Sequence, residues 1–528
     1  MMTGKKLETD LLVIGSGIAG CSAALEAAKN GLKVIVITKN ANPEESNTYH
    51  AQGGIVFLGQ NDAPELLKED IIETGGGINN PEAVEILAEH GKKLVNSILI
   101  KELKIPFARS SPEELDFAQE AGHSRRRILH VKDTTGKTIE ERFIDALRKY
   151  SNVKFITNHT AVDLLTIPHH SKNPIAFYRE PQCIGAYVLD NLSGKVKMIF
   201  SPYTILATGG CGGVYLYTSN PRSAIGDGYA MAYRAGARII NMEYIQFHPT
   251  SLFHRDADGF LISETIRGEG ARLKTKDGKT FMDKYSSKKD LAPRDEVTRA
   301  IYEEIINTNS NYVYLDLASY ATINIKKRFP YIYSTCLQYG IDITREPIPV
   351  VPAAHYCCGG VLVDKWGRTS IKGLYAAGEV SCTGVHGANR LASTSLLEGL
   401  VWGTRTAEHI TSNYSSEKPY KESEIHEWYY PKNEESIDPA LINHDWQSIR
   451  STMWNYAGII RTEKRLERAR ADLSYLLHRI EKFYKEAQMD PKIVGLKHAI
   501  QVALLITNAA ISNPVSRGAH YIKNSPKK

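Results

Sequence analysis

The side chains best suited to chemistry are two histidines and two arginines in short polar motifs: His248, Arg294, His355 and Arg390. Both residue types donate hydrogen bonds, and a guanidinium can hold a carboxylate through two parallel bonds, so this set suits an anionic ligand. Any one of these residues taken alone is more often structural than catalytic. Their significance therefore depends on the elements that bring them together.

Residues 373–399 predict a strand, a glycine-broken loop and a helix. The strand covers residues 374–377, and the turn at Gly378-Glu379 carries a carboxylate that could accept hydrogen bonds from a sugar. We expect the helix to begin near Ser395 with a capping box of Ser395 and Glu398. The free N–H groups of a helix N-terminus suit an anion or an electron-rich ring edge.

A dinucleotide-binding βαβ unit is predicted near the N-terminus. A strand at residues 10–14 leads into the glycine-rich run 15–20, then a helix at 21–29 and a second strand at 33–38. Such glycines allow a tight turn and let the backbone approach a pyrophosphate. After the second strand stands Lys39, where an acid that binds ribose is usual. This difference argues against a plain NAD site.

Two more glycine-rich strand ends follow, one after residues 204–208 and one at Gly378. Together with the run at 15–20, they predict three strands of one parallel sheet that meet at one extended ligand. Asp227 opens a further helix. The amide-rich run 46–55 could hydrogen-bond a flat polar ring.

Bulk properties limit the class of protein. The 528 residues, 42% of them hydrophobic, suffice for about three domains. The net charge of +6 is small and its basic residues are scattered, so neither nucleic acid nor a membrane is expected as a partner. We find no signal peptide and no apolar run of about 20 residues, which predicts a cytoplasmic protein. The seven cysteines contain no C-x-x-C, so no metal site is expected.

We predict an α/β fold of three domains. A Rossmann-like dinucleotide-binding domain is formed by residues 1–240 and 352–412, an α+β capping domain by the insertion 241–351, and a helical bundle by residues 413–528. Asp295 is the expected N-cap of a capping-domain helix. In the bundle, residues 446–484 are expected to be helical, Met453 and Trp454 to pack, and the basic tail after Ser512 to be mobile.

Taken in chain order, these motifs resemble the flavoprotein family of succinate dehydrogenase, fumarate reductase and L-aspartate oxidase over nearly the whole chain. The matching runs are 15–20, 51–54, 207–210, 248–250, 267–270, 293–295, 355–360 and 386–390. The resemblance implies that the dinucleotide is FAD.

The resemblance assigns roles to residues at matching positions. One substrate carboxylate would be held by His248 and Ser263 and the other by His355 and Arg390, while Glu120 would face an amine. The cofactor contacts it implies are Gly15, Ser16, Gly17, Ile18, Ala19, Gly20, Lys39, Asn47, Thr48, Tyr49, His50, Ala51, Gln52, Gly53, Gly54, Ala161, Val162, Ala207, Thr208, Gly209, Asp227, Glu379, Ser395 and Leu396.

Arg294 matches the family's proton-shuttling arginine. A guanidinium has a pKa above about 12 and gives up its proton poorly. The catalytic role therefore needs neighbours such as Glu264 and Arg267 to pass charge along. The alternative is that Arg294 only clamps a carboxylate.

Two positions favour the L-aspartate oxidase branch. The membrane-linked members attach FAD covalently to a histidine before the Ala-Gln-Gly-Gly run, where this chain has Asn47. Asparagine cannot form that bond and His50 is three residues too late, so the FAD is expected to be non-covalent. Glu120 lies in a run similar to that of the oxidases, where an acid meets the substrate ammonium.

The resemblance therefore implies oxidation of L-aspartate to iminoaspartate, with oxygen or fumarate as acceptor, as the first step of NAD biosynthesis through quinolinate. Quinolinate synthase is the implied pathway partner. The alternative is a soluble fumarate reductase or a succinate dehydrogenase flavoprotein subunit. A non-catalytic flavin sensor would not need His248, Arg294, His355 and Arg390 together, and a broader amino acid oxidase would not need two sets of carboxylate ligands.

Overall fold

A parallel five-stranded sheet forms the centre of the molecule. The computed structural model describes residues 6–59, 61–257, 259–320, 323–416, 420–431 and 437–524. The strand order is β19 (Leu374–Ala376), β12 (Tyr203–Leu206), β2 (Leu11–Ile14), β3 (Val34–Ile37) and β8 (Val153–Ile156). All neighbours pair in parallel. The prediction that three remote glycine-ended strands share one sheet is confirmed, because β19, β12 and β2 are adjacent.

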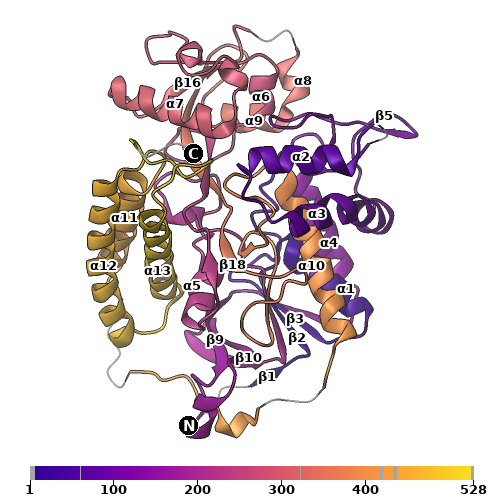
Figure 1. The fold of residues 1–528 in the computed structure, drawn as a ribbon, viewed down its shortest axis with the longest axis vertical. Helices are drawn as coiled ribbons and strands as arrows, with labels where there is room; N and C mark the ends of the chain where they lie inside the picture. The colour runs from indigo at the N-terminus through magenta and orange to yellow at the C-terminus, as the bar shows by residue number, and fades with distance from the viewer. Residues whose placement is uncertain are drawn as a thin grey trace.

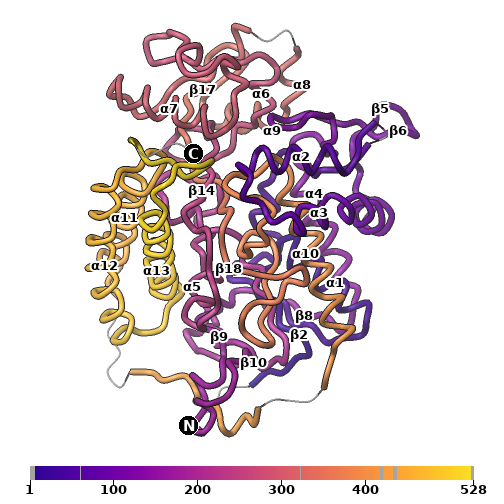
Figure 2. Tube along the Cα trace, viewed as in Figure 1, coloured from indigo at the N-terminus to yellow at the C-terminus, as the bar shows by residue number. Residues whose placement is uncertain are grey.

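Two helices that are far apart in the sequence cover one face of this sheet. They are α1 (Ile18–Lys29) and α10 (Thr394–Ser412), which lie side by side in Figures 1 and 2. Their backbones approach closely, since a Cβ on Gly403 would lie 2.4 Å from the Ala19 carbonyl oxygen. Glycine at this position therefore lets α10 pack closely against α1.

A second sheet extends the first domain. Its order is β1 (Leu7–Glu8), β11 (Lys195–Phe200), β10 (Gln182–Asp190) and β9 (His159–Ile167). Its strands bury a small apolar core together with Ile425, Met489 and Val494, which come later in the chain. Helix α5 (Asp227–Arg234) packs between this sheet and the C-terminal helices (Figure 1).

The inserted segment has a sheet and an apolar core of its own. The sheet order is β14 (Ile245–Leu252), β17 (Ile348–Cys357), β16 (Val313–Asp316) and β15 (Arg272–Lys274). Helix α7 (Arg294–Asn307) packs on β14, and the core residues lie between Leu252 and Val350. Figure 1 shows this unit at the top of the view, above α2 (Pro64–Thr74) and α3 (Pro81–Leu94). The first residue of α7 is Arg294, so the prediction that Asp295 caps this helix is wrong.

Three helices form the C-terminal part: α11 (Pro439–Tyr456), α12 (Glu463–Glu486) and α13 (Pro491–Ser512). The expected helix at 446–484 is therefore two helices, interrupted where Arg461 turns into the core. The packing role of Trp454 is confirmed, since its ring contacts Tyr217 and Phe247.

Helix α13 is long and apolar enough to cross a membrane, but 72% of its apolar window is buried inside the protein. The sequence analysis overlooked this apolar run.

The segment after Ser512 packs against the protein through residue 524, so its predicted mobility is wrong for this part. His520 is fully buried and contacts Arg461, while the Ala519 N–H donates to the Ala388 carbonyl at 2.9 Å. Residues 525–528 lie outside the described ranges. The tail therefore supports the loop that carries Arg390.

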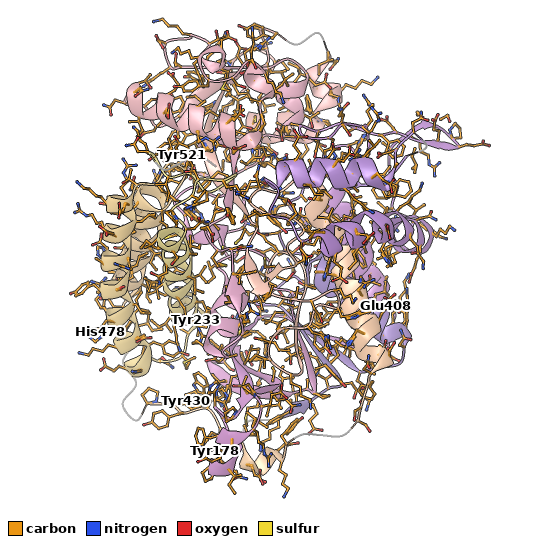
Figure 3. All side chains as sticks on the ribbon, viewed as in Figure 1. Tyr178, Tyr233, Glu408, Tyr430, His478 and Tyr521 are labelled. Atoms are coloured by element: carbon orange, nitrogen blue, oxygen red, sulfur yellow. The ribbon has the colours of Figure 1, made fainter. Side chains whose placement is uncertain are left out.

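The remaining elements are short or peripheral. They are β4 (Ile55–Val56), α2 (Pro64–Thr74), α3 (Pro81–Leu94), η1 (Val95–Glu102), β5 (Arg109–Ser111), β6 (Glu114–Leu115), β7 (Ile128–Leu129), α4 (Thr135–Leu147), η2 (Pro174–Tyr178), η3 (Gly212–Val214), β13 (Ile239–Ile240), α6 (Thr265–Gly268), η4 (Met282–Lys284), η5 (Lys289–Leu291), α8 (Ile325–Arg328), α9 (Pro330–Gln338), β18 (Gly360–Leu362), β20 (Ser381–Cys382) and η6 (Glu422–Glu424). Figure 3 shows the side chains on this frame.

Candidate active site

One large cavity follows the carboxyl ends of β2, β12 and β19 and continues beneath the inserted unit. It holds about 1750 Å³ of empty space, including its opening to solvent. The predicted cofactor residues that line it are Gly15, Ser16, Gly17, Ile18, Ala19, Lys39, Asn47, Thr48, His50, Ala51, Gln52, Gly53, Gly54, Ala161, Ala207, Thr208, Gly209, Asp227, Glu379, Ser395 and Leu396. Every predicted substrate and catalytic residue also lines it.

Three predicted cofactor residues are not among the residues that line this cavity. Gly20 packs against the turn, since a Cβ there would lie 2.1 Å from the Gly15 carbonyl oxygen. The Tyr49 ring lies 5.4 Å from the Lys137 ammonium. Val162 belongs to the core of the second sheet, and its carbonyl accepts a bond from Arg234 at 2.9 Å. The cavity wall therefore does not include these three residues, and their cofactor contacts stay a prediction.

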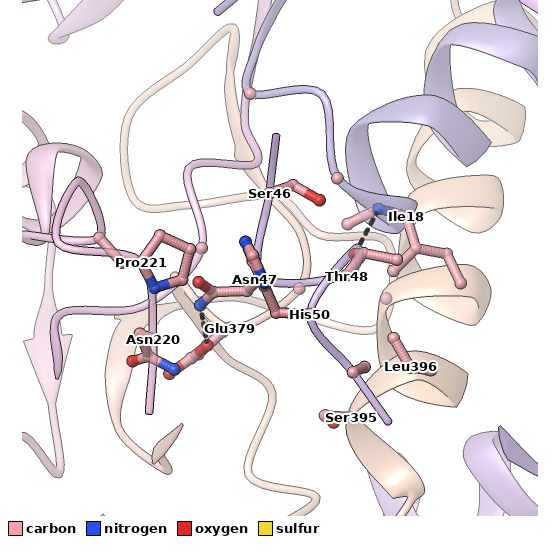
Figure 4. A pocket seen from close by; sticks show the side chains of 18 of the residues that line it. Ile18, Ser46, Asn47, Thr48, His50, Asn220, Pro221, Glu379, Ser395 and Leu396 are labelled. Carbon is pink, nitrogen blue, oxygen red and sulfur yellow. Dashed lines mark hydrogen bonds between the residues drawn. The ribbon is translucent and has the colours of Figure 1, made fainter. Parts of the chain in front are cut away.

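The turn between β2 and α1 is shaped for a close ligand. Gly15 has a φ of +112°, and a Cβ there would lie 2.1 Å from the Ala207 carbonyl oxygen, so only glycine fits between the two strand ends. At the start of α1 the Ile18 N–H donates to Thr48 Oγ1 at 3.0 Å (Figure 4). The N-terminus of α1 thus faces the cavity, as a pyrophosphate site requires.

Lys39 is neutralised by the protein itself. Its ammonium pairs with the Asp227 carboxylate and also bonds the Ser223 carbonyl. Asp227 accepts a second bond from His498 at 2.8 Å. Although burial acts against it, the Lys39 charge and His498 hold the pKa of Asp227 far below its usual range. A paired lysine does not suit the 2′-phosphate of NADP, and it leaves a neutral wall for a ribose.

The middle of the cavity offers hydrogen bonds from amide and carboxylate groups. Asn47 donates to Glu379 at 3.3 Å, as Figure 4 shows, and Glu379 also accepts the Cys357 N–H at 2.9 Å. Burial raises the pKa of Glu379 to about 7. Gln52 Oε1 and Thr208 Oγ1 are buried in the wall and have no partner among the described residues. Orphaned polar atoms beside the turn at Gly15 fit a dinucleotide with a polar ring.

The two histidines at the far end are neutral. The Thr250 N–H donates to His248 Nδ1 at 3.2 Å, which leaves Nε2 as the proton-bearing nitrogen. Burial, together with Arg294, lowers the pKa of His248 well below its usual range, and burial with Arg390 does the same for His355. The two rings lie 5.3 Å apart between centroids. His355 is held by Ser219, whose Oγ lies 2.7 Å from Nδ1.

Arg294 stands in a buried chain of charges. Its Nε donates to Glu264 Oε2 at 2.6 Å, and the other oxygen of Glu264 accepts from Arg267 at 2.7 Å. Arg267 also donates to the Asp290 carbonyl at 2.6 Å. Although burial works against its charge, Glu264 and Glu120 raise the pKa of Arg294. The chain of contacts therefore runs from the cavity through Glu264 and Arg267 to the Asp290 carbonyl.

Glu120 and Arg390 complete the far end. The Ser393 hydroxyl donates to Glu120 at 2.7 Å, and burial raises the pKa of Glu120. Arg390 donates to Ser395 at 3.1 Å, and its guanidinium carbon lies 4.7 Å above the centre of the Tyr356 ring. Helix α10 begins at Thr394 after Ser393 in a left-handed conformation, so the predicted capping box of Ser395 and Glu398 does not form.

Several residues at this end of the cavity were not predicted from the sequence. Ser219, Leu261, Tyr356 and Ser393 all line the cavity but were not predicted as site residues. Tyr356 directly follows His355, and Ser393 lies in the segment 373–399, so both motifs were noticed without a role for these positions. Gln246 was also missed. It bonds the Arg390 carbonyl at 2.8 Å and accepts from Arg294 at 3.5 Å, which links the two arginines.

The charges at this end nearly balance. The guanidiniums of Arg267, Arg294 and Arg390 face the carboxyls of Glu120 and Glu264. With both carboxyls ionised, one net positive charge remains for a ligand. With Glu120 protonated, two net positive charges remain for a ligand. The site therefore suits an anion of one or two net charges that carries carboxylates at both ends.

Comparisons with known proteins agree with this geometry. Residues 10–396 match the FAD binding domain family, and residues 446–528 match the fumarate reductase flavoprotein C-terminal family. The chain is 42% identical to L-aspartate oxidase 1 of Ralstonia nicotianae over 521 residues, which cover 98% of this chain and 96% of that protein. It is 41% identical to the L-aspartate oxidase of Yersinia pestis over 529 residues, covering 100% and 98%. A solved quinol fumarate reductase of E. coli has a TM-score of 0.87 at 26% identity, covering 99% of this chain and 93% of that one.

Proposed function

The chain belongs to the FAD-binding flavoprotein family that includes the L-aspartate oxidases, and on this premise we propose that it oxidises L-aspartate to iminoaspartate, with oxygen or fumarate as acceptor. This reaction is the first step of NAD biosynthesis through quinolinate. The observation that carries the proposal is that Glu120 lies in the same wall as two sets of carboxylate ligands. A substrate with two carboxylates and one ammonium matches all three groups.

Binding follows from charge and hydrogen-bond direction. Neutral His248 presents its Nε2–H, together with the Ser263 hydroxyl, to one carboxylate. Arg390 and His355 receive the other carboxylate. L-Aspartate carries one net negative charge, which matches the single positive charge left when Glu120 is ionised. Glu120 and the substrate ammonium then form a buried ion pair with a hydrogen bond, which also holds C2 in place.

Arg294 takes the proton that leaves the substrate during oxidation. Its Nε donates to Glu264 and its Nη1 donates to Gln246 at 3.5 Å, so Nη2 is the nitrogen left to meet the substrate. A guanidinium accepts a proton only after giving one away, and Glu264 lies at 2.6 Å to receive that proton. Arg267 continues the path away from the cavity. Although burial opposes it, Glu264 and Glu120 raise the pKa of Arg294, so this step requires that the proton pass to Glu264 as the substrate proton arrives at the guanidinium.

FAD, when bound, supplies the acceptor for the hydride from C2 and the route by which the electrons reach oxygen, giving hydrogen peroxide, or fumarate. The turn at Gly15 and the start of α1 would hold its pyrophosphate, and Gln52, Thr208 and Glu379 would be available to its polar groups. The binding is non-covalent. Asn47 lies in the cavity wall, and its amide nitrogen, which already donates to Glu379, is not a nucleophile.

We place the enzyme in the cytoplasm, with quinolinate synthase as the consumer of its product. All seven cysteines are buried and unpaired, which fits a reducing compartment. A soluble fumarate reductase is the second candidate. It is supported by the likeness to the quinol fumarate reductase and by the extra positive charge that the site carries when Glu120 is protonated.

The experiment that tests the proposal compares substrates. Purified protein loaded with FAD is mixed with L-aspartate, D-aspartate or succinate in air, and peroxide is measured. We expect peroxide with L-aspartate alone. No peroxide with L-aspartate, but oxidation of a reduced dye by fumarate, would favour the second candidate. Acid precipitation of the same protein should leave all yellow colour in the supernatant, and a yellow pellet would contradict non-covalent binding.

A further inference from the structure

A buried hydrogen-bond network lies directly behind Arg390. Glu398, in the second turn of α10, is 1% exposed. Its Oε1 accepts from the Thr383 hydroxyl at 2.6 Å, and its Oε2 accepts from the Tyr356 hydroxyl at 2.8 Å and from His386 Nε2 at 2.9 Å. One carboxylate thus joins β17, the loop between β20 and α10, and the helix itself. None of these contacts serves the mechanism described above.

The network reaches Arg390 by two routes. Tyr356 presents its ring face to the guanidinium at 4.7 Å, and its hydroxyl is held by Glu398. His386 stands four residues before Arg390 in the same loop and is held by the same carboxylate oxygen. Glu398 therefore fixes both the surface on which the guanidinium lies and the loop from which its side chain extends.

Arg390 needs this support because the protein holds it by few hydrogen bonds. Nη1 donates to Ser395 at 3.1 Å, while the buried Nε has no partner among the described residues. Stacking on an aromatic face leaves the in-plane N–H groups free for a carboxylate. A phenol that donates to a carboxylate also has a more electron-rich ring, which strengthens its attraction for a cation.

We infer that Glu398 and Tyr356 are positioning residues that set the affinity of Arg390 for the substrate carboxylate. This inference rests on the proposed function only in that Arg390 binds a carboxylate. Arg390 holds the carboxylate equally before and during the reaction, so a misplaced guanidinium weakens binding without slowing the chemical step. The signature is a change in KM with kcat preserved.

The test uses Tyr356→Phe, Glu398→Gln and the double variant, each loaded with FAD. For Tyr356→Phe we expect KM for L-aspartate and Kd for succinate to rise about tenfold, with kcat within about twofold. Succinate binding is followed by the change in flavin absorbance, which needs no turnover. Both substitutions remove the hydrogen bond between Tyr356 and Glu398, and Glu398→Gln also alters the bonds to His386 and Thr383. The double variant should therefore bind no more weakly than Glu398→Gln alone.

Tyr244→Phe is the matched control, because Tyr244 lies in the same small apolar cluster but bonds Asn513 rather than Glu398. It should leave KM and Kd unchanged. Unaltered succinate binding in Tyr356→Phe, or a lower melting temperature as the only effect, would overturn the inference. If Glu398→Gln does not fold, Tyr356→Phe alone decides. If the wild type binds succinate but does not oxidise L-aspartate, the proposed function fails. The inference is then still decided by the ratio of the succinate Kd of Tyr356→Phe to that of the wild type.

Discussion

Arg294 Nε donates to Glu264 Oε2 at 2.6 Å inside the protein, at the point where α7 begins. The same carboxylate holds Arg267 through its other oxygen. This arrangement gives a guanidinium in the cavity wall a partner for the proton it must release. It also keeps two buried positive charges from facing one another without an anion between them.

Replacing Arg294 with lysine separates binding from proton transfer. Lysine retains a positive charge for the carboxylate but cannot bond Glu264 and the substrate in the same geometry. We expect Arg294→Lys to bind succinate within about threefold of the wild type while kcat for L-aspartate falls on the order of a thousandfold. Stopped-flow measurement of flavin reduction gives the rate. Retained turnover would leave Arg294 a binding residue only.

Replacing Glu264 with glutamine tests the charge chain through stability. The substitution leaves Arg267 and Arg294 buried without their shared anion, and breaking a buried pair in this way costs about 3–5 kcal/mol. We expect Glu264→Gln to lower the free energy of unfolding by an amount in that range and to reduce kcat. Denaturant unfolding measures the first effect. An unchanged midpoint would show that water or rearrangement satisfies the two arginines.

Glu120 makes substrate choice depend on pH. Burial raises its pKa, so it takes up a proton at a higher pH than an exposed glutamate. As pH falls through that raised pKa, the site loses the anion that pairs with the substrate ammonium and gains one net positive charge. We therefore expect KM for L-aspartate to rise and Kd for succinate to fall.

The control for this prediction is Glu120→Gln, which keeps the size of the side chain but removes the titrating group. It should bind L-aspartate poorly at every pH and bind succinate without the pH dependence. Equal pH profiles in the variant and the wild type would assign the titration to another group.

Alanine substitutions at two glycines with positive φ test whether the turn at Gly15 is needed to hold the cofactor. A Cβ at Gly15 would meet the Ala207 carbonyl oxygen at 2.1 Å, whereas a Cβ at Gly31 would meet nothing within 4 Å. Gly31→Ala therefore carries only backbone strain, of about 1–2 kcal/mol, while Gly15→Ala must also push two strand ends apart. We expect Gly15→Ala to lose FAD on gel filtration and Gly31→Ala to retain it. Similar retention would mean that the turn can relax.

The sheet and most of the cavity wall could be predicted because local pattern determines them. Glycine after an apolar strand marks a carboxyl end, and parallel strands bring those ends together at one edge. This reasoning placed residues near 15, 208 and 379 in one cavity, and the structure has them there. The charged residues were placed by family resemblance rather than by spacing, since nothing local joins Glu120 to Ser393.

The errors have physical causes as well. Glu398 occupies the capping-box position in sequence, but its carboxylate is used by Tyr356, His386 and Thr383, which tertiary folding brings to it. The tail after Ser512 is polar and predicts mobility, yet Arg461 and Ala388 hold it. Both cases depend on contacts between residues far apart in the chain, which local patterns do not contain.

The central claim is that this cavity brings L-aspartate and FAD together. The most direct test is an anaerobic titration of the FAD-loaded protein with L-aspartate, followed by absorbance between 350 and 500 nm. This range is set by the flavin and is about the same in flavoproteins generally. Loss of the yellow absorbance with L-aspartate, but not with D-aspartate or succinate, is the predicted result. A spectrum that L-aspartate leaves unbleached in the absence of oxygen would contradict the account.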